Sequence, residues 1–241
     1  MKMPAILIAI AVLAGVAWGQ ESVCIGASDS GLVSPVDAEL EALLGRMDKA
    51  SAEVTTIEAD ITITHTENFS GRESVRAGKI YVKKPSDMLI DLATPVARKI
   101  WISKEELVDY RSDLKTGARV KLTGDDTAGS QVLGLSTTSA ELRESFVITL
   151  MPPGEKPAQY VLTLTPREGV KADFTEAVVT VDAKSLLPVP IEEKNSELDE
   201  SKVYALSKTK KNPRLGDELF TPKFAKDAEI DDFTPGEYEG P

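Results

Sequence analysis

The sequence has few of the side chains that usually carry out catalysis or bind metals. Its 241 residues include a single cysteine, Cys24, and a single histidine, His65. One cysteine excludes an internal disulfide, so a packed core has to stabilise the fold. A zinc site usually takes three or four His, Cys or carboxylate ligands, and this chain cannot supply a set built on His and Cys. We therefore expect neither a metal site nor a cofactor.

The motifs of common enzyme classes are also missing. No G-x-S-x-G turn supplies a nucleophile for a triad that uses His65. A Gly-rich phosphate loop and a dinucleotide fingerprint are absent as well. Paired carboxylates could cleave glycosides, but five tyrosines and two tryptophans leave few rings to stack on sugars. We interpret His65 as a strand-end histidine, and we expect a protein that is not an enzyme and has no catalytic residues.

Basic side chains are scarce relative to acidic ones. The chain has 28 Lys and Arg against 39 Asp and Glu, which gives a formal net charge of −11. Binding to a phosphate backbone needs clustered lysine and arginine, so we expect no nucleic acid partner. The ordinary consequence of such a charge is solubility.

Only one long apolar run occurs, at residues 4–16. It follows the positive charge of Lys2 and precedes Ala17 and Gly19, which are small residues at the third and first positions before a cleavage site. Because a bilayer crossing takes about 20 apolar residues, this run is short for a membrane anchor. The pattern is typical of a cleavable signal peptide over residues 1–19, and it predicts export to the periplasm.

Residues 20–34 are rich in Ser, Gly and Asp, and we predict a flexible N-terminal segment there. Cys24 lies in this segment, where an exported protein can be lipidated. The acidic Glu21 does not fit a lipidation motif. We therefore interpret Cys24 as a thiol left in the flexible segment.

A helix is predicted for residues 35–50. Ser34 is a suitable N-cap, and Pro35 suits the first helical position. Five apolar residues then recur at helical spacing on one side, and they are Val36, Leu40, Leu43, Leu44 and Met47. The sequence therefore predicts an amphipathic helix of about four turns with one face to bury.

From Thr55 onward the apolar period changes to two. Ile57, Ala59, Ile61 and Ile63 alternate with polar residues, as in a strand with one solvated face. Nine to twelve strands are predicted in total, residues 218–220 among them, with one short helix at residues 139–144. Consecutive strands with few helices favour an antiparallel meander, and so long a sheet must curl, split or close. We expect a mainly β (α+β) fold, one sheet face covered by helices, and a frayed acidic tail at residues 234–241.

Four segments resemble one known family, the LolA-type outer-membrane lipoprotein carriers. Residues 78–85, GKIYVKKP, resemble the family's G-x-L-x-V-K-R-P strand, and residues 103–110, SKEELVDY, stand where it has a D-G-K-x-L-W-x-Y turn. Residues 160–166 are similar to its F-x-L-x-P strand, and residues 218–227 to its C-terminal F-x-F-x-x-P segment. The resemblance covers about residues 36–233 and depends on the order and spacing of these segments.

The resemblance implies an incomplete antiparallel β-barrel, or half-barrel, over residues 35–233, with an apolar hollow covered by a helical lid. It also implies a periplasmic carrier, or chaperone, that holds the acyl chains of lipoproteins in that hollow. Such a carrier receives its cargo from an inner-membrane lipoprotein-releasing transporter and passes it to an outer-membrane acceptor. Family members work as monomers and use no ATP themselves.

Two sets of side chains are predicted to form the binding site. The aliphatic residues expected to contact lipid are Ile61, Ile63, Ile80, Val82, Met88, Ile90, Leu92 and Ile100. The residues expected at the lid contact are Lys84, Leu40, Leu43, Leu44 and Met47. Lys84 takes the place of the family's usual lid-holding arginine, and a lysine offers fewer hydrogen bonds. Met88 and Ile90 stand where aromatic residues are frequent in the family.

Three alternatives to lipoprotein transport fit the same residues. A regulator with the same half-barrel would sense lipid or mislocalised lipoprotein and contact a membrane protein. A carrier of another lipid would use the same hollow. A structural β-domain would instead pack these aliphatic side chains against one another in a closed core.

Overall fold

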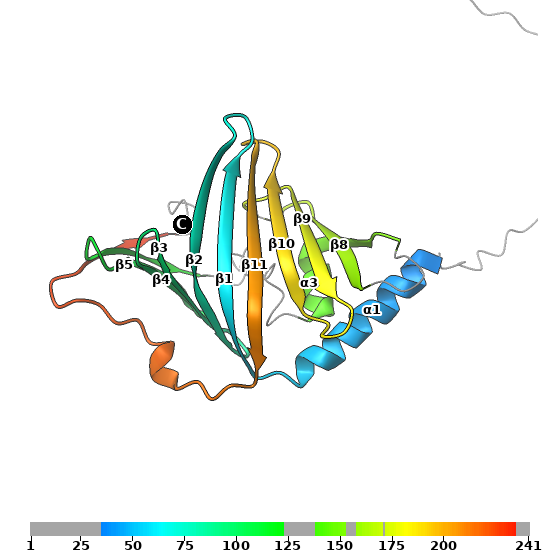
Figure 1. Ribbon diagram of the computed structural model, residues 1–241, viewed down its shortest axis with the longest axis horizontal. Helices are drawn as coiled ribbons and strands as arrows, with labels where there is room; N and C mark the ends of the chain where they lie inside the picture. The colour runs from blue at the N-terminus through cyan, green and yellow to red at the C-terminus, as the bar shows by residue number, and fades with distance from the viewer. Residues whose placement is uncertain (1–34, 123–137, 153–157, 171, 235–241) are drawn as a thin grey trace, which may run out of the picture. The chain divides into compact units, whose positions relative to one another are not determined.

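The computed structural model describes residues 35–122, 138–152, 158–170 and 172–234 (Figure 1). All of them belong to the compact unit Ser34–Pro241. The predicted signal peptide at residues 1–19, the predicted flexible segment at 20–34 with Cys24, and residues 235–241 of the predicted tail lie outside the described residues.

The described residues form two α-helices, one 3-10 helix and twelve strands. The helices are α1 (Pro35–Ala52), α3 (Ser139–Ser145) and η1 (Asp217–Leu219). The strands are β1 (Thr56–Glu67), β2 (Arg72–Lys83), β3 (Asp87–Thr94), β4 (Arg98–Ile102), β5 (Glu106–Arg111), β6 (Thr116–Lys121), β7 (Phe146–Leu150), β8 (Gln159–Pro166), β9 (Glu176–Asp182), β10 (Pro188–Asn195), β11 (Glu200–Lys211) and β12 (Glu229–Phe233). Both predicted helices are present, and no described helix has the length and apolar character that a membrane crossing requires.

All twelve strands belong to one sheet, in the order β12-β6-β5-β4-β3-β2-β1-β11-β10-β9-β8-β7. Its end strands, β12 and β7, are not paired with each other, so the sheet is curled and open and does not close into a barrel. Figure 1 shows the long strands β2, β1, β11 and β10 side by side at its centre. The expected antiparallel half-barrel is confirmed, apart from one parallel pair between β12 and β6.

One face of the sheet, here called the inner face, carries the main core. On β1 the buried positions alternate with half-buried ones, and Ile57, Ala59, Ile61 and Ile63 all point to this face. The α1 residues Leu40, Leu43 and Leu44 belong to the same apolar cluster. The period-two pattern of the strands and the 3.6-residue pattern of α1 therefore meet in one core.

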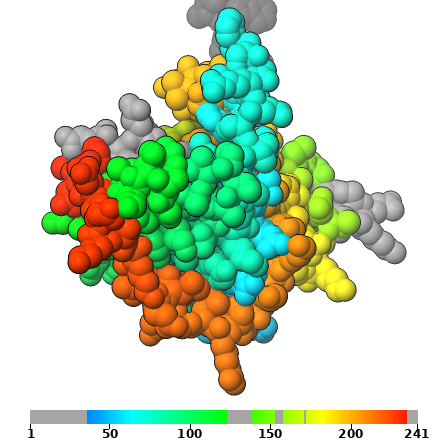
Figure 2. All heavy atoms as spheres, turned by 60° about the vertical axis from the view of Figure 1, so that its left-hand side comes forward, coloured from blue at the N-terminus to red at the C-terminus, as the bar shows by residue number. Residues whose placement is uncertain are grey.

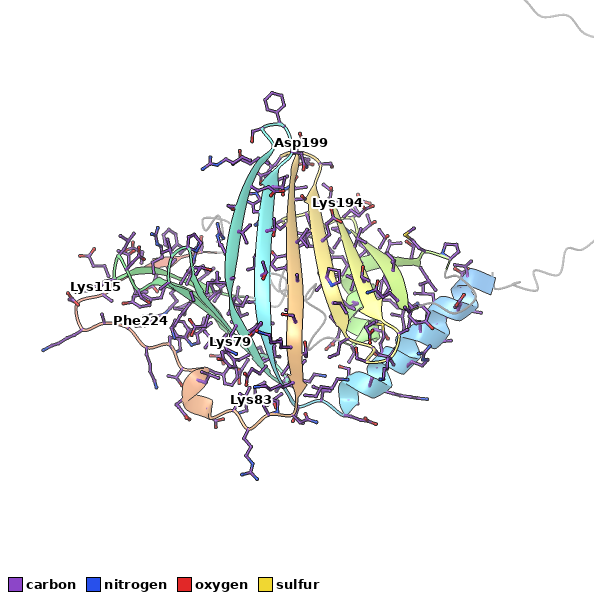
Figure 3. All side chains as sticks on the ribbon, viewed as in Figure 1. Lys79, Lys83, Lys115, Lys194, Asp199 and Phe224 are labelled. Carbon is purple, nitrogen blue, oxygen red and sulfur yellow. The ribbon has the colours of Figure 1, made fainter. Side chains whose placement is uncertain are left out.

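The opposite, outer face carries a second, smaller cluster under the C-terminal segment. Trp101 and Tyr110 are buried there and make edge-to-face contacts with Phe224, which Figure 3 labels on the C-terminal segment. The indole Nε1 of Trp101 donates to the Leu219 carbonyl at 3.1 Å. Figure 2 shows the C-terminal segment, coloured orange to red, lying against the green strands of this half of the sheet.

The predicted strand at residues 218–220 is wrong. Leu219 and Phe220 donate their backbone N–H groups to Gly216 and Asp217, which closes the 3-10 helix η1 instead of a strand ladder. The apolar residues of this segment pack on the outer face through their side chains. Their spacing in the sequence therefore reflects this packing and not strand alternation.

Gly78, the first residue of the GKIYVKKP segment, is required by strand packing. The pairing of β2 with β3 shifts register between Ala77 and Gly78. A Cβ atom at position 78 would lie 2.0 Å from the backbone oxygen of Asp91. Only glycine lets the two backbones approach so closely.

Candidate functional site

An apolar pocket lies between α1, α3 and the inner face of β7 to β10. Its empty volume is about 730 Å³ including the part open to solvent, and its enclosed free volume is about 50 Å³. The lining residues are Leu44, Met47, Asp48, Ser51, Val54, Ile57, Lys84, Ser139, Leu142, Ile148, Leu162, Leu164, Val179, Leu186, Leu187 and Pro188. Most of these side chains are aliphatic, so the pocket suits a hydrocarbon chain and offers little to a polar reactant.

Three of the predicted site residues line this pocket, namely Leu44, Met47 and Lys84. Leu40 and Leu43 are buried in the adjoining core. The eight residues predicted to contact lipid are all buried in that same core, and none of them lines the pocket. Their close packing is what a closed core would show, whereas the free space lies farther along the inner face.

The opposite pocket wall comes from strands that the sequence analysis did not single out. Ile148 on β7, Leu162 and Leu164 on β8, and Val179 on β9 supply it. The available signal was a partial alternation of apolar and polar residues, because apolar residues such as Val147 and Val178 also stand on the less buried side of these strands. That signal identifies the buried side of a strand, but it does not tell which buried residues face free space.

Lys84 ties the last turn of α1 to the end of β2. Its ammonium group donates to the Ser51 carbonyl at 2.6 Å and to the Ser51 hydroxyl at 2.5 Å. Burial lowers the pKa of Lys84 because water is removed from the charged group. The last carbonyls of a helix have no partner within the helix and carry the negative end of its dipole. The Ser51 carbonyl also accepts from the Val54 N–H at 3.1 Å, so Lys84 gives it a second donor and places a positive charge where it is favourable.

Polar contacts also hold α1 to α3 and to β8. The carboxylate of Asp48 accepts hydrogen bonds from the Ser139 backbone at 2.9 Å and from the Ser139 hydroxyl at 2.5 Å. Arg46 donates to the Tyr160 hydroxyl at 3.2 Å, with its guanidinium 5.6 Å from the ring centroid. These contacts are half-buried or exposed, and water can replace each of them at modest cost. Core packing and these polar contacts, and not a β ladder, therefore attach α1 to its described neighbours.

A second, polar pocket of about 180 Å³ lies beside the β10–β11 hairpin. Its lining residues are Asp173, Phe174, Glu193, Asn195, Leu198, Glu200, Ser201 and Lys202. The Tyr204 hydroxyl donates to the Glu193 carboxylate at 3.0 Å. Burial raises the pKa of Glu193 to about 7, while the Tyr204 hydrogen bond and Lys202 lower it less. Burial, assisted by Glu193, also raises the pKa of Tyr204 well above its ordinary value.

His65 lies near the end of β1, and its Nε2 is 3.0 Å from a carboxylate oxygen of Glu200. This contact joins β1 to β11 near the polar pocket. Within the described part of the chain, no three His, Cys, Asp or Glu side chains gather closely enough to hold a metal ion.

Several solved structures resemble this chain. An uncharacterized conserved protein from Thermus thermophilus is 10% identical, with 81% of this chain and 99% of that chain covered and a TM-score of 0.51. A DUF1329 family protein from Desulfovibrio piger is 15% identical over 78% of this chain and 97% of its own, with a TM-score of 0.49. A LolA superfamily protein from Nitrosomonas europaea is 14% identical over 76% of this chain and 97% of its own, with a TM-score of 0.42. The comparison with curated proteins finds no match.

The sequence also matches a family described as "Outer membrane lipoprotein carrier protein LolA" over residues 52–223. The matched region runs from the last residue of α1 to just beyond η1, and so includes β1 to β11. The resemblance found in the sequence is thereby confirmed. This chain belongs to the LolA family of outer membrane lipoprotein carrier proteins.

Proposed function

We propose that this protein is a periplasmic carrier that holds the acyl chains of lipoproteins and moves them from the inner to the outer membrane. The observation that carries the proposal is the aliphatic pocket under α1, in a chain of the LolA family. Its partners would be an inner-membrane lipoprotein-releasing transporter and an outer-membrane acceptor, and the carrier would act as a monomer. Cleavage after residue 19 would release it into the periplasm.

The energetics of an acyl chain require such an enclosure. Burying each CH₂ group is worth about 0.8 kcal/mol, so a long chain does not travel freely through water. Ligand pockets typically hold about 300–1,000 Å³, whereas the enclosed free volume here is about 50 Å³. Loading therefore requires α1 to move outward. We expect the eight predicted lipid contacts to extend the pocket wall when Leu40, Leu43 and Leu44 leave the shared core.

The proposal is tested by placing a carboxylate on each side of β7. Ile148 is half-buried and lines the pocket, whereas its neighbour Val147 faces outward and is 45% exposed. Binding is measured by displacing the neutral dye N-phenyl-1-naphthylamine with monopalmitoylglycerol. Ile148→Glu should weaken displacement about fivefold, because the acyl chain meets a charged group that has to stay hydrated. The matched Val147→Glu variant should bind as the unmodified protein does.

Saturable displacement at micromolar protein is the expected result for the unmodified chain. No displacement, together with no saturable dye binding, would remove the carrier function. An equal loss of monopalmitoylglycerol affinity in the two glutamate variants would show that the pocket under α1 is not the binding site.

A further inference from the structure

The inner face becomes polar toward the β10–β11 hairpin, which Asp199 marks in Figure 3. The change from apolar to polar residues occurs at the same height on the four neighbouring strands β2, β1, β11 and β10. Ile63 on β1 lies opposite Arg76 on β2 and Tyr204 on β11, and Tyr204 lies opposite Ile191 on β10. Two residues farther along each strand the side chains point to the inner face again. There His65 on β1 pairs with Lys202 on β11, and Lys202 pairs with Glu193 on β10. Aliphatic residues at one end of the face are thus continued by polar ones.

The apolar and polar pockets are in line along β9 and β10. Val179 lines the apolar pocket and lies opposite Ile191, while Glu193 lines the polar pocket and lies opposite Ala177. The two levels are one inner-face step apart, or about 7 Å along the strand. Phe174, stacked on Phe146 with ring centroids 5.9 Å apart, belongs to both the core and the polar wall. Both pockets therefore lie along the same face of the sheet.

Two cations at the polar end form no ion pair within the described residues. They are Arg76 and Lys202, and both side chains are half-buried. β1 separates their strands, and Lys202 lies two residues farther along than Arg76, so the backbones of the two residues are about 12 Å apart. Arg76 lowers the pKa of Tyr204 and Lys202 lowers that of its partner Glu193, so both positive charges act on the same hydrogen-bonded pair. Such long side chains can converge on one anionic group.

Three carboxylates line the same pocket, and none of them forms an ion pair with Arg76 or Lys202 within the described residues. Glu200 is in contact with His65, and Asp173 is exposed at the pocket rim. Glu193 is hydrogen-bonded to Tyr204, and burial favours its neutral form. While Glu193 is protonated, two cations and two carboxylates therefore remain at this pocket, and the carboxylates lie against His65 and at the exposed rim.

We propose that the polar pocket and its flanking Arg76 and Lys202 bind the anionic head group of a lipid whose acyl chain occupies the apolar pocket. This inference rests on the proposed carrier function and narrows the ligand to an amphiphile with a phosphate or carboxylate head. The two pockets together accept the two chemically different ends of one molecule. The stacked Phe174 and Phe146 then lie beside the junction between chain and head.

The affinity for an anionic head should rise as the pH falls through about 7. Protonation of Glu193 removes a negative charge beside Lys202, while a phosphodiester stays anionic throughout. The other titratable and charged groups near Glu193 are Arg76, His65, Asp173, Glu200 and the neutral Tyr204 hydroxyl. Replacing Glu193 by glutamine should hold the affinity near its low-pH value at every pH.

The test compares two ligands that share one chain. Palmitoyl lysophosphatidylglycerol carries a phosphodiester and monopalmitoylglycerol carries no charge, and each displaces N-phenyl-1-naphthylamine below its critical micelle concentration. We expect the anionic ligand to bind about tenfold tighter at pH 6. The double variant Arg76→Gln/Lys202→Gln should bring the ratio to about one without changing monopalmitoylglycerol binding. Lys208→Gln is the matched control, since Lys208 is on β11 but is 82% exposed and pairs with Asp60.

The outcomes separate this inference from the proposed function. Failure of both ligands to bind would overturn the carrier function. Equal binding of the two ligands by the unmodified protein, or a tenfold preference that persists in the double variant, would overturn the head-group site alone. If the double variant unfolds, the test uses the salt dependence of the unmodified protein. Its preference for the anionic ligand should fall severalfold between 50 and 500 mM NaCl if charge is the cause of that preference.

Discussion

Replacing Lys84 by methionine should make the C-terminal turn of α1 open at least tenfold more often. The change removes the charged donor from the Ser51 carbonyl and hydroxyl, and it leaves that carbonyl only the neutral Val54 N–H at 3.1 Å. Hydrogen bonds from charged groups contribute about 1.5–3 kcal/mol, and about 1.4 kcal/mol corresponds to a factor of ten. Amide hydrogen exchange at residues 47–52 is the direct measurement, and the exchange rate of a bound acyl ligand should rise with it.

Two further variants make this test specific. Lys83→Met alters the neighbouring residue, whose ammonium pairs with Asp217, and it should leave exchange in α1 unchanged. Lys84→Arg should slow exchange, because the guanidinium offers more donors to the helix end. Unchanged protection of residues 47–52 in Lys84→Met would mean that Lys84 does not hold α1 in place.

The second large effect concerns Glu193 and pH. Burial raises the pKa of Glu193 from its ordinary value of 4.5 to about 7 in the folded chain. A folded protein that prefers the protonated form is most stable below pH 4.5, and it loses that stability as the pH rises through about 7. Glutamine keeps an acceptor for Tyr204 without the charge. Glu193→Gln should therefore raise the free energy of unfolding by about 2–3 kcal/mol at pH 8 and by little at pH 5.

Urea unfolding at pH 5 and pH 8 measures this difference directly. Glu192→Gln provides the control, because Glu192 is adjacent on β10 and faces away from the inner side. Its effect should be the same at both pH values. A Glu193→Gln variant whose gain in stability does not change with pH would show that Glu193 is not held neutral by burial.

Much of the fold follows from periodicity in the sequence. The alternation in residues 57–63 and the stripe of Leu40, Leu43, Leu44 and Met47 assign the buried sides of β1 and α1 correctly, whereas Val36 of the predicted stripe is 37% exposed in the first turn of α1. The segment at residues 218–220 was misassigned because its backbone N–H groups bond locally and its side chains pack on the outer face. Spacing alone does not separate a short strand from a 3-10 helix whose side chains pack on a sheet.

The candidate site was only partly predictable. Lys84 was expected at the lid because of its place before Pro85, and it does contact α1. The aliphatic residues of β1 to β4 were expected to face a hollow, but they are packed in the core, and the pocket wall comes from β7 to β10. The Glu193–Tyr204 pair was not expected, because its partners lie on different strands and each has the local pattern of an ordinary strand residue.

The sequence by itself determined which side of β1 and of α1 is apolar, because side-chain direction follows the local repeat of two or 3.6 residues. Its motifs were also sufficient to identify the family. Only the tertiary structure decided where the apolar face is filled and where it is left open. That depends on how closely α1 and α3 approach each strand, which is set by contacts between residues far apart in the chain, such as Lys84 with Ser51 and Asp48 with Ser139.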